Sequence, residues 1–138
     1  MFFKKYKKNE VLEPLDVAIK WPSGLMARTE SAIWFIKSGK KFKCFSERSA
    51  ASWNLNIIEA TDNSLSGLKS GGVLGFRDGS LIKDISDGKI YLVSENKIRH
   101  ILDPDFIKIL NMTILDVSRK EISIHEFGDD LNGFYNTI

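Results

Sequence analysis

Two histidines and one cysteine are the residues of this chain best suited to acid–base or nucleophilic chemistry. His100 lies in a predicted strand, where alternation places it on the same face as Ile98 and favours a packing role. His125 stands beside Glu126, and a neighbouring carboxylate can tune an imidazole for proton transfer. Because no nucleophile or metal ligand is identifiable beside it, we interpret His125 as a solvent-facing or helix-capping histidine. A lone cysteine such as Cys44 is usually an inert small hydrophobe.

Carboxylates are more numerous, but their spacing matches no known cation site. The pair Asp103 and Asp105 lacks the alternating oxygen ligands and distal glutamate of an EF-hand loop. Turns and helix caps account for the other aspartates, which are Asp84, Asp87, Asp116, Asp129 and Asp130. The glycine-rich stretch 71–75 lacks the Gly-Lys-Ser/Thr ending of a phosphate-binding loop, and we expect a flexible linker there. We therefore predict no catalytic residue, no metal and no cofactor, and hence no enzyme.

Composition and charge narrow the classes of protein further. With 43% hydrophobic and 28% charged residues in 138, the chain has the make-up of an ordinary globular protein. Its net charge of +2 is too small to argue for nucleic acid as a partner. Charged residues interrupt every apolar stretch and the start does not resemble a secretory signal, so we expect no membrane partner and synthesis in a cytoplasm.

The chain contains two similar halves, which align with an offset that rises from 55 to 57 residues. Gly24 matches Gly79 at 55, Cys44 matches His100 at 56, and Asn54 matches Asn111 at 57. Each copy has the pattern of three short strands, a capped short helix, one more strand and a helical stretch. The closing helical stretches are predicted over residues 63–67 and 119–127.

This repeat predicts the fold class: α+β, mainly β, with two tandem β-β-β-α-β repeats of about 55 residues packed together. The predicted divisions are a basic and aromatic arm with a possible strand, two repeats and a tail: 1–20, 21–75, 76–131 and 132–138. Residues 1–75 carry a net charge of +5 and residues 76–138 a net charge of −3. Such polarity favours assembly contacts.

Basic residues interleaved with aromatic ones occur in two places. In residues 37–43 the lysines could contact phosphates, but a solvated hairpin edge protected from aggregation is the favoured interpretation. The second place is the N-terminus, which we predict to be an arm that docks on a partner. Its aromatic rings would fill partner pockets while its lysines steer it onto an acidic surface, through Phe2, Phe3, Lys4, Lys5, Tyr6, Lys7 and Lys8.

The order of segments 78–83, 89–93 and 97–101 resembles a tandem unit of virion structural proteins from large tailed bacteriophages, especially those of marine cyanobacteria. The unit also occurs in bacterial surface proteins. Segment 46–55 is similar to the helix that follows the strands in that unit, and segment 124–128 to its closing part. The resemblance covers residues 21–131 and brings no active-site residues with it.

The resemblance implies a non-catalytic virion structural protein of the tail, neck or baseplate, or a capsid decoration. It would be made in the host cytoplasm, reside in the virion and contact other virion proteins, in multiple copies of a symmetric particle. A carbohydrate- or cell-wall-binding module is the alternative, in which Trp21, Trp34 or Tyr91 would stack on sugar rings. Core packing is the competing role for these three aromatic residues.

Overall fold

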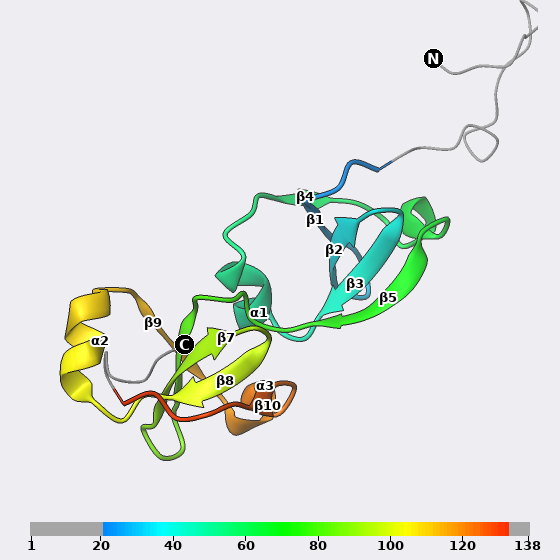
Figure 1. The fold of residues 1–138 in the computed structure, drawn as a ribbon. Helices are drawn as coiled ribbons and strands as arrows, with labels where there is room; N and C mark the ends of the chain where they lie inside the picture. The colour runs from blue at the N-terminus through cyan, green and yellow to red at the C-terminus, as the bar shows by residue number, and fades with distance from the viewer. Residues whose placement is uncertain (1–20, 133–138) are drawn as a thin grey trace, which may run out of the picture.

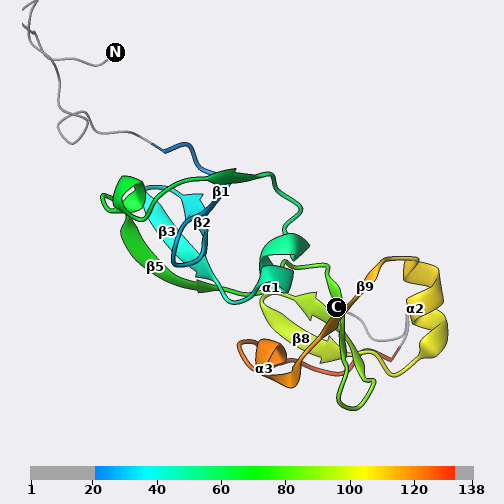
Figure 2. The same cartoon turned by 180° about the vertical axis from the view of Figure 1, so that it is seen from behind.

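The computed structural model describes residues 21–132 (Figure 1). The predicted docking arm and the possible strand before residue 21 lie outside the described residues, as does the tail after Asn132. Within the described range the chain forms two lobes that lie side by side in both views, with helix α1 at their junction (Figures 1 and 2).

The first half contains one mixed five-stranded sheet in the order β4-β1-β2-β3-β5. The three central strands form an antiparallel meander, and β4 and β5 pair in parallel with β1 and β3. Helix α1 leads from β3 to β4, and the 3-10 helix η1 leads back to the opposite edge. The elements are β1 (Leu25–Arg28), β2 (Ile33–Lys37), β3 (Lys40–Cys44), α1 (Glu47–Ser52), β4 (Ile57–Glu59), η1 (Asn63–Leu65) and β5 (Lys69–Leu74).

The second half repeats this topology, with the strand order β9-β6-β7-β8-β10 and the same pattern of parallel and antiparallel pairs. Its elements are β6 (Leu81–Asp84), β7 (Ile90–Ser94), β8 (Lys97–His100), α2 (Pro104–Leu110), β9 (Ile114–Val117), α3 (Arg119–Ile122) and β10 (Glu126–Phe127). The predicted fold class, α+β and mainly β with two similar halves, is confirmed.

Local sequence explains the hairpins and the helix starts. The β2–β3 turn at Ser38 and Gly39 has positive φ at both residues (50° and 75°), which matches the twist of a two-residue hairpin. The equivalent β7–β8 turn at Glu95 and Asn96 does the same. Ser46 caps α1 through a hydrogen bond from the Ser49 N–H, in agreement with the capped short helix predicted for each half.

The repeat offset is 55 in the first strand of each half and 57 from the second strand onward. Gly24 donates its N–H to Ile36, and Gly79 donates to Val93, so the partners differ by 57. Both extra residues lie between Lys83 and Ile90, at the end of β6 and in the loop that follows, because the equivalent pair in the first half is Arg28 and Ile33. The predicted offset of 56 in the hairpin is wrong, and Cys44 corresponds to Ile101 rather than His100. The residue types of the two halves match at an offset of 56 or 57, so they did not identify the correct one. The geometry of the turn determines which strand residues pair.

Residues 71–75 are not the flexible linker that their glycines suggested, because residues up to 74 belong to β5. The Phe42 ring occupies the space that a side chain at Gly71 would need, and the pairing of β3 with β5 shifts register there. Gly128 occupies the equivalent place, against Arg99. Each unit therefore ends in a fifth strand that was not predicted, and the closing helices are shorter than predicted, at 63–65 and 119–122.

Each half buries its own apolar core. Met26, Ala27, Ile36 and Leu65 are fully covered in the first half, and Ile82, Val93 and Ile98 in the second. Within residues 21–132 no cluster of buried apolar side chains draws members from both halves. The two halves therefore have separate apolar cores.

Candidate functional site

A buried carboxylate, Glu121, joins the two halves. It is the third residue of the short helix α3, where its Oε1 accepts the Ser118 N–H at 3.0 Å in a capping box. The same side chain reaches across to the start of α1. Its Oε2 accepts the Ser46 hydroxyl at 2.5 Å, and Oε1 lies 2.6 Å from Nη1 of Arg48. In the first half Ser64 occupies the equivalent capping position, where its hydroxyl group and N–H bond to Thr61 in the same turn.

The surroundings of Glu121 favour its charged form. Burial on its own raises the pKa of the carboxyl group, since its side chain is only 8% exposed. Hydrogen bonds from the Ser118 N–H, the Ser46 hydroxyl and Arg48 outweigh burial, so the pKa of Glu121 lies below its ordinary value of 4.5. Because the Glu121 carboxylate accepts hydrogen bonds from both halves, it links them.

The short chain segment between the sheets is held from both sides. The Trp53 indole, on the first half, donates to the Gly75 carbonyl at 2.9 Å. On the second half, Nε2 of His125 accepts the Phe76 N–H at 2.9 Å, and its Nδ1 lies 2.9 Å from the Asn96 carbonyl. His125 therefore carries its proton on Nδ1, because Nε2 faces a donor.

The expectation for His125 as a solvent-facing or capping residue is wrong, because it is 4% exposed and packed against the Phe76 ring. A side chain at Gly75 would collide with its imidazole. The residues next to His125 in the sequence could not predict its burial, because its hydrogen-bond partners lie 29 and 49 residues away in the chain. His100 lies beside Tyr91, with 5.4 Å between ring centroids.

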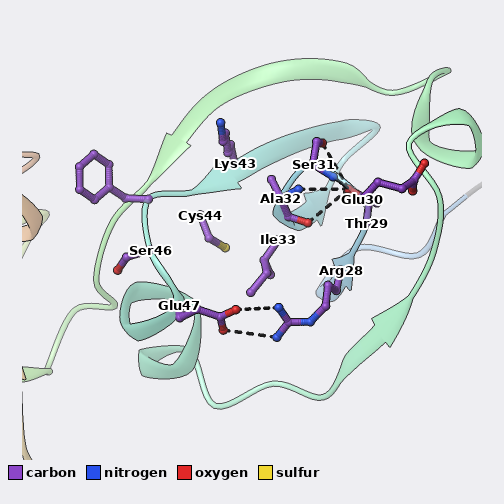
Figure 3. A pocket seen from close by; sticks show the side chains of 11 residues that line it. Arg28, Thr29, Glu30, Ser31, Ala32, Ile33, Lys43, Cys44, Ser46 and Glu47 are labelled. Atoms are coloured by element: carbon purple, nitrogen blue, oxygen red, sulfur yellow. Dashed lines mark hydrogen bonds and ion pairs between the residues drawn. The ribbon is translucent and has the colours of Figure 1, made fainter.

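A pocket of about 360 Å³ opens in the first half between the β1–β2 loop and the start of α1 (Figure 3). Arg28 and Glu47 point toward one another across it, with N–O distances of 2.6 and 3.3 Å. The hydrogen bond and charge of Glu47 raise the pKa of Arg28, and Arg28 lowers that of Glu47. The two charges largely neutralise each other, so the pocket presents no isolated charge of this pair to a ligand.

Cys44 lines the same pocket but is a poor nucleophile. Burial, together with the charge of Glu47, raises the pKa of its thiol to about 11. The thiol is consequently protonated at neutral pH, and the thiolate is the reactive form. The pocket has the polar lining of a binding site and lacks a prepared nucleophile at this cysteine.

A second groove of about 360 Å³ lies in the second half, between the β6–β7 loop, α3 and β10. Its lining includes Asp84, Asp87, Lys89, Tyr91, Arg119 and Phe127. Arg119 lies between the two aspartates, with Nε 3.0 Å from Asp84 and Nη2 2.9 Å from Asp87. Hydrogen bonds from Ser86 and then from Arg119 lower the pKa of Asp84 against the effect of its burial.

The sequence did not predict that these residues form a groove. Two signals were present: the inserted loop that carries Asp87, and the differences between equivalent positions of the two repeats. Phe127 stands where the first half has Ser70, and Arg119 where it has Asp62. The equivalence becomes visible only with the corrected offset of 57.

The three aromatic residues suggested for sugar stacking are engaged within the fold. Tyr91 is buried, and Trp21 donates its indole N–H to the Ser64 carbonyl at 3.3 Å. Trp34 donates to the Thr29 hydroxyl at 3.0 Å, and the Lys41 ammonium lies over its ring, 4.8 Å from the centroid. The predicted arm residues, Phe2 to Lys8, lie outside the described residues.

Residues 21–132 contain no cluster of three or more histidine, cysteine or acidic side chains arranged to hold a metal ion. In that same range no helix has the length and apolar character needed to cross a membrane.

Comparison with known proteins found a weak structural similarity and no related family. No family model matches the chain, and no curated protein matches it. Among solved structures, it is similar at 15% identity to a chain of the periplasmic assembly from the ESX-5 inner membrane complex, with a TM-score of 0.31. The match covers 80% of this chain and 35% of the other, so this chain spans about a third of that protein's length. A likeness this weak supports no inference about function.

Proposed function

We propose that this protein is a non-catalytic structural component that works through protein–protein contacts. The observation that supports the proposal most is the fastening between the halves through Glu121, which receives Ser46 and Arg48. Together with the Trp53 and His125 hydrogen bonds to the connecting segment, it holds two separately cored β lobes in one orientation. A fixed orientation is what a component that spaces or aligns its neighbours requires.

The surfaces for such contacts are the outer strands of the two sheets. Strands β4 and β5 form the edges of one sheet and β9 and β10 those of the other, and within residues 21–132 none has a further strand beside it. Open edges can pair with a strand of another chain. Apolar side chains are exposed on or near the strands and α2, with Val73 at 57%, Ile109 at 58% and Leu102 at 48%.

The finer part of the proposal is the setting. On the resemblance of segments 78–83 and 97–101 to the tandem unit of phage virion proteins, we place the protein in the tail, neck or baseplate of a tailed phage, or on its capsid. Its partners are other virion proteins, repeated by the symmetry of the particle.

Incorporation into particles tests this function. Particles purified by gradient centrifugation from cells that make the tagged chain should contain it at a constant copy number, measured by quantitative mass spectrometry. Deleting residues 1–10 should lower that number without lowering the melting temperature, because the aromatic and basic arm is predicted to dock on a partner.

Junction variants provide the matched comparison. Arg48→Ala breaks an ion pair between the halves, whereas Arg28→Ala breaks an ion pair within the first half. Incorporation should fall for Arg48→Ala and stay normal for Arg28→Ala. Absence of the wild-type protein from particles would overturn the proposed setting, and equal incorporation of both variants would overturn the role of the fixed orientation.

A further inference from the structure

The groove in the second half presents an aromatic surface to solvent. Phe127, on the two-residue edge strand β10, is 69% exposed, more than any other large apolar residue in the described part of the chain. Its ring lies edge-on to buried Tyr91, with 6.0 Å between centroids and 60° between planes. An exposed aromatic ring beside a recess is suited to stack on an apolar ligand face.

Next to this ring is a planar group with hydrogen-bonding capacity to spare. Arg119 is held by Asp84 and Asp87 through its Nε and one Nη2 proton, which are two of the five N–H donors of a guanidinium. Its side chain is nevertheless 66% exposed. Asp87 adds acceptor lone pairs beyond those used by Arg119 and the Lys89 N–H. Donors and acceptors in fixed, adjacent positions suit hydroxyl groups, which both donate and accept.

Charge in the groove favours a neutral ligand. Asp84 and Asp87 are balanced by Arg119 and Lys89, so the lining has no net formal charge. An anion would meet two carboxylates and a cation would meet a guanidinium and an ammonium group. The volume, about 360 Å³, is at the lower end of the range for small-molecule sites. These properties together describe a small neutral polyol with one apolar face.

The first half has different residues at the positions that line this groove in the second half. At the equivalent positions it has Ser70 for Phe127 and Asp62 for Arg119, and its shorter loop has no counterpart of Asp87. Trp34 takes the place of Tyr91 and is covered by Lys41. Buried core positions are apolar in both halves; Leu65 and Ile122, for example, are equivalent and both buried. The two halves therefore have similar core positions and different residues at the positions of the groove.

We propose that the groove between Phe127 and Arg119 binds a neutral sugar ring, whose apolar face stacks on Phe127 and whose hydroxyl groups bond to Arg119 and Asp87. The groove residues are not those of the junction on which the proposed structural role rests, although Arg119 and Glu121 belong to the same helix, α3. The sequence suggested that a sugar would stack on Trp21, Trp34 or Tyr91. The present proposal assigns that role to Phe127 instead, which the sequence analysis did not name.

Titration of the full chain, followed by ¹⁵N NMR, tests the site. The probes are methyl glycosides of glucose, galactose, mannose and N-acetylglucosamine, and their β-1,4-linked disaccharides, at millimolar concentrations. At least one should shift the Phe127 and Gly128 amides and the Arg119 Nε–H signal, and leave the Ser70 and Gly71 amides unchanged. Absence of shifts with every probe would overturn the proposal, as would shifts spread equally over both halves.

Variants separate stacking from folding. Phe127→Ala should weaken binding by about tenfold or more and leave the melting temperature within a degree or two, because the ring is mostly exposed. Phe127→Trp should retain binding, and Val73→Ala, at an exposed apolar site in the first half, should have no effect. Arg119→Lys retains the charge but loses the planar donors, and should also weaken binding. Unchanged affinity in Phe127→Ala would overturn the stacking role.

Pull-down on insoluble cellulose, chitin and peptidoglycan distinguishes the source of the sugar. Retention on one polymer, lost in Phe127→Ala, would assign the groove to a cell-surface or cell-wall glycan. Binding of soluble glycosides without retention on any polymer would assign it to free sugars. A preference for sialic acid or a sugar phosphate over all neutral probes would overturn the assignment to a neutral ring.

Discussion

Nη1 of Arg48, in the first half, lies 2.6 Å from Oε1 of Glu121, in the second, across a junction that joins two separate apolar cores. Arg48 is half exposed and Glu121 is buried, so the two partners contribute unequally. Removing the exposed partner leaves the carboxylate two other donors, Ser46 and the Ser118 N–H. Removing the carboxylate leaves the cap of α3, the Ser46 hydroxyl and Arg48 without their shared acceptor.

Glu121→Ala should therefore lower the free energy of unfolding by about 3 kcal/mol, since it removes a buried charged acceptor and half of a capping box. Arg48→Ala should cost about 1 kcal/mol. Urea denaturation monitored by tryptophan fluorescence measures both. Equal small losses would indicate that Glu121 is solvated and does not fasten the halves. Glu47→Ala, at an exposed pair within the first half, is the control and should change little.

Acid should weaken the junction. Because hydrogen bonds hold the pKa of Glu121 below its ordinary value of 4.5, the carboxylate stabilises the fold fully above that value, where it is ionised in both states. Its contribution is lost as the pH falls below 4.5 through the lower folded-state pKa. Urea midpoints measured from about pH 6 to about pH 3 should fall less steeply in Glu121→Gln than in the wild type. Parallel pH profiles in the two proteins would refute this assignment.

The connecting segment should not tolerate a side chain at Gly75. Gly75→Ala would push a methyl group into the His125 imidazole, and relief of that clash would break the Phe76 hydrogen bond, at about 1–3 kcal/mol. Gly67→Ala is the matched control, because nothing lies near its Cβ position and its φ is not positive. It should be neutral or slightly stabilising. Calorimetric melting temperatures compare the two, and equal values would contradict the tight packing.

The Cys44 thiol should react slowly with Ellman's reagent in the native protein. It is buried, and its pKa is raised to about 11, so little thiolate exists near neutral pH and the reagent has poor access to it. Full reactivity should appear on addition of urea, with the same midpoint as unfolding. Rapid modification of the folded protein near neutral pH would show that the Cys44 thiol is accessible from the pocket of Figure 3.

Features that depend on neighbouring residues can be predicted from the sequence. The duplication and the helix start at Ser46 follow from local residue types, as do the left-handed turns at Asn54 and Asn111. Such features are set by φ preferences and by side-chain hydrogen bonds to nearby backbone, which a short window of sequence contains.

Features that depend on residues distant in the sequence became visible only in the folded chain. The fifth strand forms because β3 offers it an open edge, although its glycines favour a loop. His125 is buried because the Phe76 N–H and the Asn96 carbonyl meet there. The groove beside Phe127 needs an inserted loop, α3 and an edge strand at one place. Burial and long-range hydrogen bonding override local preference at these sites, and no local pattern records which distant groups will meet.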